Sequence, residues 1–396
     1  MSEKIKNILN QEDFSKNDLI ELMKIDNKED LDLLFKKAYE IKAKYVGKKV
    51  YYRGLIEISN KCIKNCKYCG IRRDNHKVDR FSMSKSEIME AVKWIYENNY
   101  ASIALQSGER QDEEFVSFIE DLIREIKNFS SGKLGITLSL GEQSKETYKR
   151  WFEAGAHRYL LRIESTNLDI YNHLHPMDNK HTFEVRKKCL EYLRDIGYQV
   201  GTGVMIGLPN QTEEDLVNDI LFYKDMNIDM IGMGPYILHK DTPLGQEWKD
   251  IVVSEEKRVE LGLKMIAITR IFLKDVNIAA TTALQGLDPQ GREKGLLAGA
   301  NILMPTATAL EHKNKYLLYD DQRWKCKLFI NYKTVNKDNE QHLINFISKD
   351  LEINTSLISR KYITSKIQRK YSISHNEYRT YNHSLYLVTF TNNYDK

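Results

Sequence analysis

The sequence predicts an α/β protein built on a TIM-type (β/α)8 barrel of parallel strands. Eight short apolar runs, rich in β-branched residues or glycine, recur between residues 52 and 305, and amphipathic segments separate them. Strands that are apolar on both faces and joined through helices are typical of a parallel sheet. The alternation fills about 250 residues, the usual size of such a barrel. A doubly wound open sheet is the alternative, because sequence alone does not show closure.

The strands and helices follow from the local patterns. Ser84 and Glu87 have the spacing of a capping box at the start of a helix whose Ile88, Val92 and Ile95 share one face. Further helices are predicted over residues 113–129, 212–226 and 254–272. The segment 212–226 begins with Thr212 and has acidic residues in its first turn. The predicted strands are 52–59, 102–108, 135–141, 158–164, 199–208, 230–237, 277–283 and 301–305.

Composition divides the chain into three parts. Residues 1–50 are polar and predict an N-terminal helical segment that ends at Gly47. Residues 51–320 would form the barrel, and residues 321–396 a C-terminal extension of unknown fold. Residues 331–396 hold 10 Lys/Arg and 6 Asp/Glu, a net charge of +4 that equals the charge of the whole chain. The barrel region therefore has no basic stripe, and nucleic-acid binding is not expected. The extension is either a small α/β element that contacts a partner or a poorly ordered tail.

Hydropathy argues against membrane insertion and export. Mean hydropathy is −0.53, and the chain lacks the run of about 18 apolar residues that a membrane span needs. The first residues carry no apolar signal core, so a cytoplasmic protein is expected. Five cysteines are too few for a disulfide scaffold in a chain of this length.

Three of the cysteines form the most specific motif, Cys62-x3-Cys66-x2-Cys69, directly after the first predicted strand. The spacing favours a 4Fe–4S cluster held by three thiolates, which leaves one iron open to a small molecule. A structural zinc site would need a fourth ligand such as His76, and redox or inert cysteines are a third reading. The loop lies where such barrels hold their chemistry, at the carboxyl end of a strand.

This loop, with Tyr68 before the last cysteine, is similar to that of the radical S-adenosylmethionine (SAM) superfamily. The resemblance implies that the open iron binds the amino and carboxylate groups of SAM. The reduced cluster would then cleave SAM and release a 5′-deoxyadenosyl radical. The ordered stretches "NKCIKNCKYCGIRRDN", "LQSGE", "TLSLGE", "AGAHRYLLRIES", "MIGLPNQT" and "IAATTA" resemble the HydE family of FeFe-hydrogenase maturases, over about residues 40–320.

The polar residues of these strands are the candidate binding groups. A carboxylate such as Glu164 suits a cation or ribose hydroxyls, and a guanidinium such as Arg186 suits a carboxylate. The family pattern places both on SAM, although a structural ion pair between them is the alternative. The resemblance further implies that Gln106, Ser107, Gly108 and Glu109 line the methionine part of SAM. On the substrate side it points to Ser139, Arg162, Thr281, Thr282, Met304 and Tyr316, and also to Tyr319. Structural roles inside the barrel are the alternative for these residues.

The implied function is that of an anaerobic, oxygen-labile radical SAM enzyme of hydrogenase maturation. It would help to assemble the dinuclear iron subcluster of the H-cluster from an iron–cysteine–CO–CN precursor that a partner radical SAM maturase supplies. A GTPase scaffold maturase, and ferredoxin or flavodoxin as electron donor, are the further expected partners. The alternatives are a methylornithine synthase-like or biotin synthase-like enzyme and a non-catalytic iron–sulfur scaffold.

The sequence also departs from the family. Some members carry a second cluster on three C-terminal cysteines, but here only Cys189 and Cys326 remain outside the loop. Cys189 shares a helix face with Val185 and Leu193 and is expected in the core. A second cluster is therefore not predicted.

Overall fold

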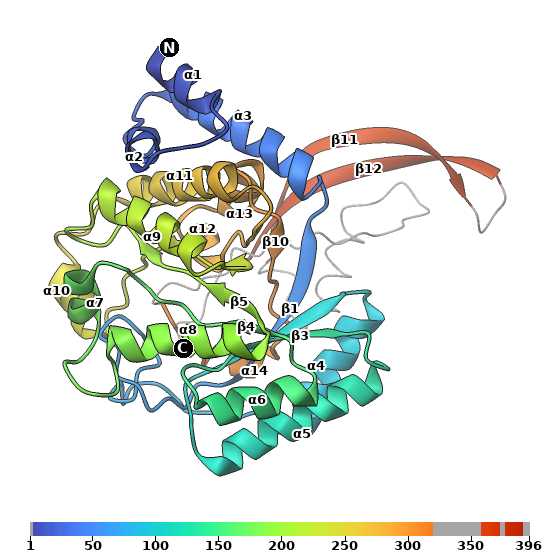
Figure 1. Cartoon of the computed structure of the whole chain (residues 1–396). Helices are drawn as coiled ribbons and strands as arrows, with labels where there is room; N and C mark the ends of the chain where they lie inside the picture. The colour runs from blue at the N-terminus through green and yellow to red at the C-terminus, as the bar shows by residue number, and fades with distance from the viewer. Residues whose placement is uncertain (1–2, 320–357, 373–376, 391–396) are drawn as a thin grey trace. The chain divides into compact units, whose positions relative to one another are not determined.

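The computed structural model describes residues 3–319, 358–372 and 377–390 (Figure 1). The chain divides into two compact units, residues 1–322 and 323–396. The predicted three-part division, with boundaries after residues 50 and 320, stays a prediction. None of the described helices combines the length and the apolar composition needed to cross a bilayer.

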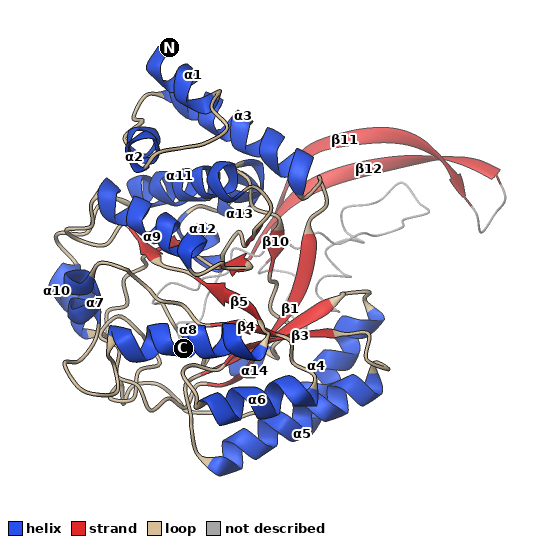
Figure 2. Ribbon diagram, in the orientation of Figure 1, coloured by secondary structure: helices blue, strands red, loops and turns tan. Residues whose placement is uncertain are grey.

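The elements of the first unit alternate between strands and helices for most of its length (Figure 2). Its strands are β1 (Tyr51–Ser59), β2 (Ser102–Ser107), β3 (Gly135–Ser139), β4 (Arg158–Leu160), β5 (Gln199–Thr202), β6 (Met205–Ile206), β7 (Met230–Ile231), β8 (Gly234–Pro235), β9 (Asn277–Ile278) and β10 (Ile302–Leu303). Its helices are α1 (Glu3–Leu9), α2 (Lys16–Met23), α3 (Lys28–Tyr45), α4 (Lys85–Glu97), α5 (Glu113–Phe129), α6 (Lys145–Ala154), α7 (Leu168–Leu174), α8 (Phe183–Ile196), α9 (Glu213–Asp225), α10 (Pro243–Trp248), α11 (Glu255–Leu273), α12 (Thr282–Leu287), α13 (Gly291–Leu297) and α14 (Leu310–Lys313).

Within the described residues, eight strands form a parallel sheet in the order β10-β1-β2-β3-β4-β5-β7-β9. The two outer members meet through a parallel bridge between Ala279 and Ile302. The Ala280 N–H donates to the Ile302 carbonyl (3.0 Å), and the Asn301 N–H to the Ile278 carbonyl (2.9 Å). The sheet therefore closes on itself. The predicted (β/α)8 barrel is confirmed, and the open sheet is excluded.

The predicted helices form where their caps and apolar faces place them. Ser84 accepts a hydrogen bond from the Glu87 N–H, and the Glu87 carboxylate accepts one from the Ser84 N–H, which completes the capping box of α4. Ile88, Val92 and Ile95 are fully buried on the face that α4 presents to the barrel. α5 spans the predicted range, and α9 and α11 begin after Thr212 and Ser254 as expected. These caps fix where each helix leaves the edge of the barrel.

Two predicted strands are each divided in two. Residues 199–208 divide into β5 and β6, and residues 230–237 into β7 and β8, with β6 and β8 paired in a small separate sheet. The two segments pass close to each other where these strands divide, since a Cβ on Gly203 would lie 2.3 Å from the Gly232 carbonyl oxygen. β4 likewise ends at Leu160, and Glu164 rejoins the neighbouring chain only through a single bridge to Val204. The polar residues at the end of predicted strand 158–164, Arg162 and Glu164, therefore lie in a loop at the carboxyl edge of the barrel.

The second unit contributes one described feature, an antiparallel hairpin of β11 (Ile358–Ser372) and β12 (Glu377–Phe390). Its register runs from the pair Ser372 and Glu377 to the pair Ile358 and Phe390, with an irregularity after Tyr362. The remainder of the predicted extension, Cys326 included, lies outside the described residues.

Candidate active site

The cysteine loop follows β1 at the carboxyl edge of the barrel, where the sequence placed it. Cys66 is buried, and Cys62 and Cys69 are partly exposed. The pKa of the Cys66 thiol is raised to about 12, mainly by burial and also by the neighbouring Cys62, while Arg186 acts in the opposite direction. The pKa of Cys69 lies well above its usual value, first through burial and then through Cys66 and Cys62. Each thiol therefore lies within electrostatic range of the others.

One guanidinium holds this loop in shape. Arg80 Nη1 donates to the carbonyls of Asn60 and Ile71, both at 2.7 Å. Arg80 Nη2 donates to the carbonyls of Arg72 (2.6 Å) and Asn75 (3.1 Å). A planar fork of five N–H donors can serve these four carbonyls of one loop at once, one more than the three donors of a lysine. Sequence reasoning missed Arg80, because no motif marks a residue that binds only backbone carbonyls.

The donor set fits a cluster of several irons better than a single zinc ion. Tetrahedral zinc, with Zn–S bonds of about 2.3 Å, brings its sulfurs within about 3.8 Å of each other. In the described part of the chain, the three cysteine sulfurs do not form a group in which every sulfur lies within 4.8 Å of the others. His76, the fourth ligand that zinc would need, is exposed. The Cys62 Sγ also accepts a hydrogen bond from the Glu109 N–H (3.3 Å), a contact typical of cluster thiolates.

A buried network of four charges lies beside the loop. Lys64 Nζ contacts Glu142 Oε2 (2.7 Å) and Glu109 Oε1 (3.4 Å), and Arg186 Nε contacts Glu142 Oε1 (2.7 Å). All four side chains are at most 8% exposed. Burial, and then the charge of Glu142, raises the pKa of Glu109 to about 7. Sequence analysis missed Lys64 and Glu142; the "TLSLGE" stretch contained Glu142 but gave it no role.

Glu164 and Arg186 do not pair with each other. Arg186 is bound to Glu142, whereas Glu164 Oε2 lies 3.1 Å from Arg162 Nη2. The alternative of a structural Glu164–Arg186 ion pair is therefore wrong. Glu164 Oε2 is buried with Arg162 Nη2 as its ion-pair partner, whereas the buried Arg162 Nε has no hydrogen-bond partner in the part of the chain that the structure describes. Buried polar atoms ordinarily have partners, so this Nε marks a place for a polar ligand.

The Gln106–Glu109 turn lies against the cysteine loop. The Gly108 N–H donates to the Ser59 carbonyl (2.9 Å), and the Ser107 hydroxyl donates to the Gly108 carbonyl (2.6 Å). A Cβ on Gly108 would lie 2.3 Å from the Lys61 carbonyl oxygen and 2.8 Å from Cys62 Cβ. Gly108 is thus needed for the close approach of two loops, a reason that the sequence did not reveal.

The predicted substrate residues have mixed surroundings. Thr281 Oγ1 is buried without a hydrogen-bond partner among the described residues, whereas Thr282 accepts a bond from Arg292 Nη2 (2.9 Å). Ser139 and Met304 are half-buried near the ends of β3 and β10. Burial, and next Glu57, Cys69 and Cys62, raise the pKa of Tyr316 well above its usual value. Tyr316 therefore lies close to the cysteines. Thr282 already has a structural contact, as does Arg162, whose Nη2 donates to the Val204 carbonyl (2.9 Å).

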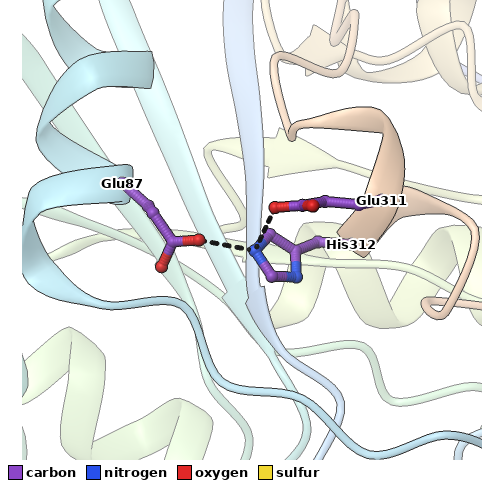
Figure 3. A group of neighbouring side chains, drawn as sticks. All are labelled: Glu87, Glu311 and His312. Carbon is purple, nitrogen blue, oxygen red and sulfur yellow. Dashed lines mark hydrogen bonds and ion pairs between the residues drawn. The ribbon is translucent and has the colours of Figure 1, made fainter.

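A second group of potential metal ligands lies apart from the cysteines (Figure 3). His312 Nε2 is 2.9 Å from Glu87 Oε1 and 3.4 Å from Glu311 Oε1. His312 also stacks on Phe81, with ring centroids 4.9 Å apart. These contacts join α14 to the first turn of α4. They hold the segment that follows α14, which carries Tyr316, and we read the group as an ion pair.

Comparison with known proteins agrees with this geometry. Residues 56–223 match the model of the Radical SAM superfamily. The HydE subunit of the FeFe-hydrogenase maturase of Thermotoga maritima is 44% identical over 312 residues, which cover 78% of this chain and 85% of that protein. A 3-methylornithine synthase of Methanosarcina acetivorans is 27% identical over 307 residues, 76% of this chain and 83% of that protein.

Solved structures agree on the fold. The crystal structure of a methylornithine synthase superimposes with a TM-score of 0.67 at 20% identity, over 89% of this chain and 98% of that one. At 20% identity, this likeness is evidence for the fold and not for the function. The sequence match, with 44% identity across most of both chains, is what decides the family. The chain belongs to the HydE family of FeFe-hydrogenase maturases within the radical SAM superfamily, and it is a radical SAM enzyme.

Proposed function

We propose that this protein acts in FeFe-hydrogenase maturation, using a 4Fe–4S cluster that Cys62, Cys66 and Cys69 hold with one iron left open to SAM. The observation that carries the proposal is the convergence of three thiols at the carboxyl edge of the barrel, where Glu164 is buried and Arg162 Nε has no hydrogen-bond partner among the described residues. The 44% identity to HydE supports the maturation role.

The site residues divide between SAM and the cluster loop. Glu164 Oε2 offers an acceptor to the ammonium group or a ribose hydroxyl. Within the described chain, Arg186 Nε donates to Glu142 and Arg186 Nη1 to the Arg162 carbonyl, so its Nη2 donors are suited to the SAM carboxylate. Gln106, Ser107, Gly108 and Glu109 line the methionine part. When bound and reduced, the cluster supplies the electron that cleaves a carbon–sulfur bond of SAM and so produces an organic radical.

The substrate is proposed to be the iron–cysteine complex with carbon monoxide and cyanide that a partner radical SAM maturase delivers. Arg162, whose Nε has no hydrogen-bond partner among the described residues, would bind its carboxylate or cyanide. Ser139, Thr281, Thr282, Met304 and Tyr316 would line the remaining surface. We further propose a cytoplasmic location, a GTPase scaffold maturase as acceptor of the product, and ferredoxin or flavodoxin as electron donor.

The ligation is tested by replacing single cysteines in anaerobically reconstituted protein. Cys66→Ser is expected to lose most of the cluster iron and to form no 5′-deoxyadenosine from SAM after dithionite reduction. Cys189→Ala is the matched control, because Cys189 is buried in the core and its Sγ lies 3.7 Å from the Gln143 carbonyl. It should keep both iron and turnover. Normal SAM cleavage by Cys66→Ser would contradict the proposal.

The maturation role is tested separately. Apo-FeFe-hydrogenase is incubated with the partner maturases, with and without this protein, and hydrogen evolution is measured. Activity should depend on this protein and on SAM. Formation of 3-methylornithine from lysine would instead favour the methylornithine synthase alternative. A protein that holds the cluster without cleaving SAM would be the scaffold.

A further inference from the structure

The main chain at Glu164 adopts a conformation that residues other than glycine ordinarily avoid. Its φ is +69°, in the left-handed region, and it is not glycine. Such a conformation is strained and persists only where the surroundings impose it. On the strand side, the Glu164 N–H donates to the Gly203 carbonyl (3.0 Å), and the Met205 N–H donates to the Glu164 carbonyl (2.9 Å). These two bonds hold the amide and the carbonyl of Glu164 against the neighbouring segment, but they do not reach Thr166.

The exit of this turn is held by α9. Asp219 Oδ1 accepts hydrogen bonds from the Thr166 N–H (2.8 Å) and from the Thr166 hydroxyl (2.6 Å). One turn earlier on α9, Asp215 Oδ1 accepts a bond from Asn167 Nδ2 (2.7 Å). Residues two and three positions after Glu164 are therefore anchored to one helix, and Asp219 holds the nearer of them twice.

Asp219 is an unusual residue to bury. It is 0% exposed, and its second oxygen, Oδ2, has no hydrogen-bond partner among the described residues. Burial raises its pKa to about 7, and the two bonds from Thr166 act in the opposite direction. An apolar side chain at this position would avoid the cost of a half-satisfied carboxyl group. The contacts that Asp219 does make all serve Thr166.

We propose that Asp219 is a positioning residue for Glu164, holding the turn so that the Glu164 carboxylate faces the bound SAM. The inference rests on the proposed function, since it takes Glu164 to be a SAM contact. Asp219 contacts Thr166 rather than Glu164, so it acts on Glu164 through Thr166. Loss of its acceptor oxygen would let Thr166 move and the left-handed conformation relax, which would turn the Glu164 carboxylate away from its ligand.

The test compares variants in the reconstituted holoprotein, with the SAM dissociation constant as the first measurement. Asp219→Leu removes the acceptor and is expected to weaken SAM binding roughly 10- to 100-fold, the value of one charge-assisted hydrogen bond. Asp219→Asn keeps an acceptor oxygen and should restore binding to within about threefold. Thr166→Val removes one of the two donors and should give an intermediate loss; it also serves if Asp219→Leu does not fold.

Ile220→Ala is the matched control for stability. Ile220 is adjacent on α9 and fully buried in the core, so this change should lower the unfolding temperature and leave SAM affinity unchanged. The second measurement needs no SAM. Amide hydrogen exchange across residues 164–167 should accelerate in Asp219→Leu and Thr166→Val, and stay near wild type in Asp219→Asn.

Unchanged SAM affinity in both Asp219→Leu and Thr166→Val, or unchanged exchange across the turn, would overturn the inference. Glu164→Gln separates it from the proposed function. If Glu164→Gln weakens SAM binding while the Asp219 and Thr166 variants do not, only the positioning role is wrong. If Glu164→Gln has no effect on SAM affinity, the proposed SAM contact fails, and the inference fails with it.

Discussion

At the scale of single residues, the site depends on Glu142, which bridges two buried cations. Burial alone would raise its pKa, but Arg186 and then Lys64 lower it below the usual value. Its two oxygens are divided between them, with Oε1 on Arg186 and Oε2 on Lys64, both at 2.7 Å. Glu142 therefore keeps both cations paired and fixes the direction of the Arg186 side chain.

Glu142→Ala is expected to be among the most damaging single changes in the barrel. Removing one partner of a buried ion pair costs about 3–5 kcal/mol, because the remaining charge is left uncompensated. The free energy of unfolding, measured by urea titration, should fall by that amount. Glu146→Ala, at an exposed position four residues away, is the control and should change it by less than about 0.5 kcal/mol. Equal effects would mean that the network does not carry the stability assigned to it.

At the scale of elements, α4 and α14 are joined through one carboxylate. Glu87 Oε2 accepts the N–H and the hydroxyl of Ser84, both at 2.6 Å, and Glu87 Oε1 faces His312 on α14 (2.9 Å). The bonds from Ser84 and His312 lower the pKa of Glu87 to about 2. One residue thus begins a helix and positions the segment that carries Tyr316.

This depressed pKa predicts a pH dependence with a definite sign. A carboxyl group whose folded pKa lies below its unfolded value of about 4.3 contributes stability above that value and loses it as the pH falls toward about 2. Glu87→Gln should therefore lower the free energy of unfolding at pH 7, by less than about 1 kcal/mol because the side chain is partly exposed. The difference from wild type should shrink between pH 4 and pH 2 in urea titrations. A difference that stays constant across that range would contradict the assignment.

At the scale of the whole first unit, the N-terminal helices are fixed to the barrel by a buried lysine. Lys264 on α11 is 2% exposed. Its Nζ donates to the carbonyls of Met23 (2.7 Å) and Ile25 (2.9 Å) at the end of α2. Figure 1 shows α1 to α3 gathered beside α11. The same ammonium lies 3.3 Å from Glu260, so its charge is partly compensated.

Lys264→Met should loosen the N-terminal helices more than the barrel. Two carbonyls would lose their donor, at a cost of about 2 kcal/mol or more. Hydrogen exchange should accelerate across residues 3–25, while the strands of the barrel stay protected. Lys257→Met, on the same helix and in contact with the same Glu260 but largely exposed, is the matched control. Uniform acceleration throughout the unit would show that these helices and the barrel unfold as one body.

Much of this molecule was determined by local sequence patterns. Helical spacing and caps such as Ser84 with Glu87 predicted the helices, because both depend on residues within a few positions of each other. The strand pattern predicted the barrel, and the cysteine spacing predicted where the chemistry lies. These patterns, together with the ordered family stretches, were enough for the family, which the comparison with HydE confirmed.

Tertiary structure alone decided which charges meet. Arg186 pairs with Glu142, a residue from a different loop, whereas the sequence placed Arg186 and Glu164 on SAM and offered an ion pair between them only as the alternative. The carboxyl edge of the barrel brings together loops from several strands, and the sequence carries no record of the distances between them. The same reason explains Arg80, Asp219 and Gly108: each acts on main chain that is remote or unremarkable in sequence, and only the closed barrel places it there.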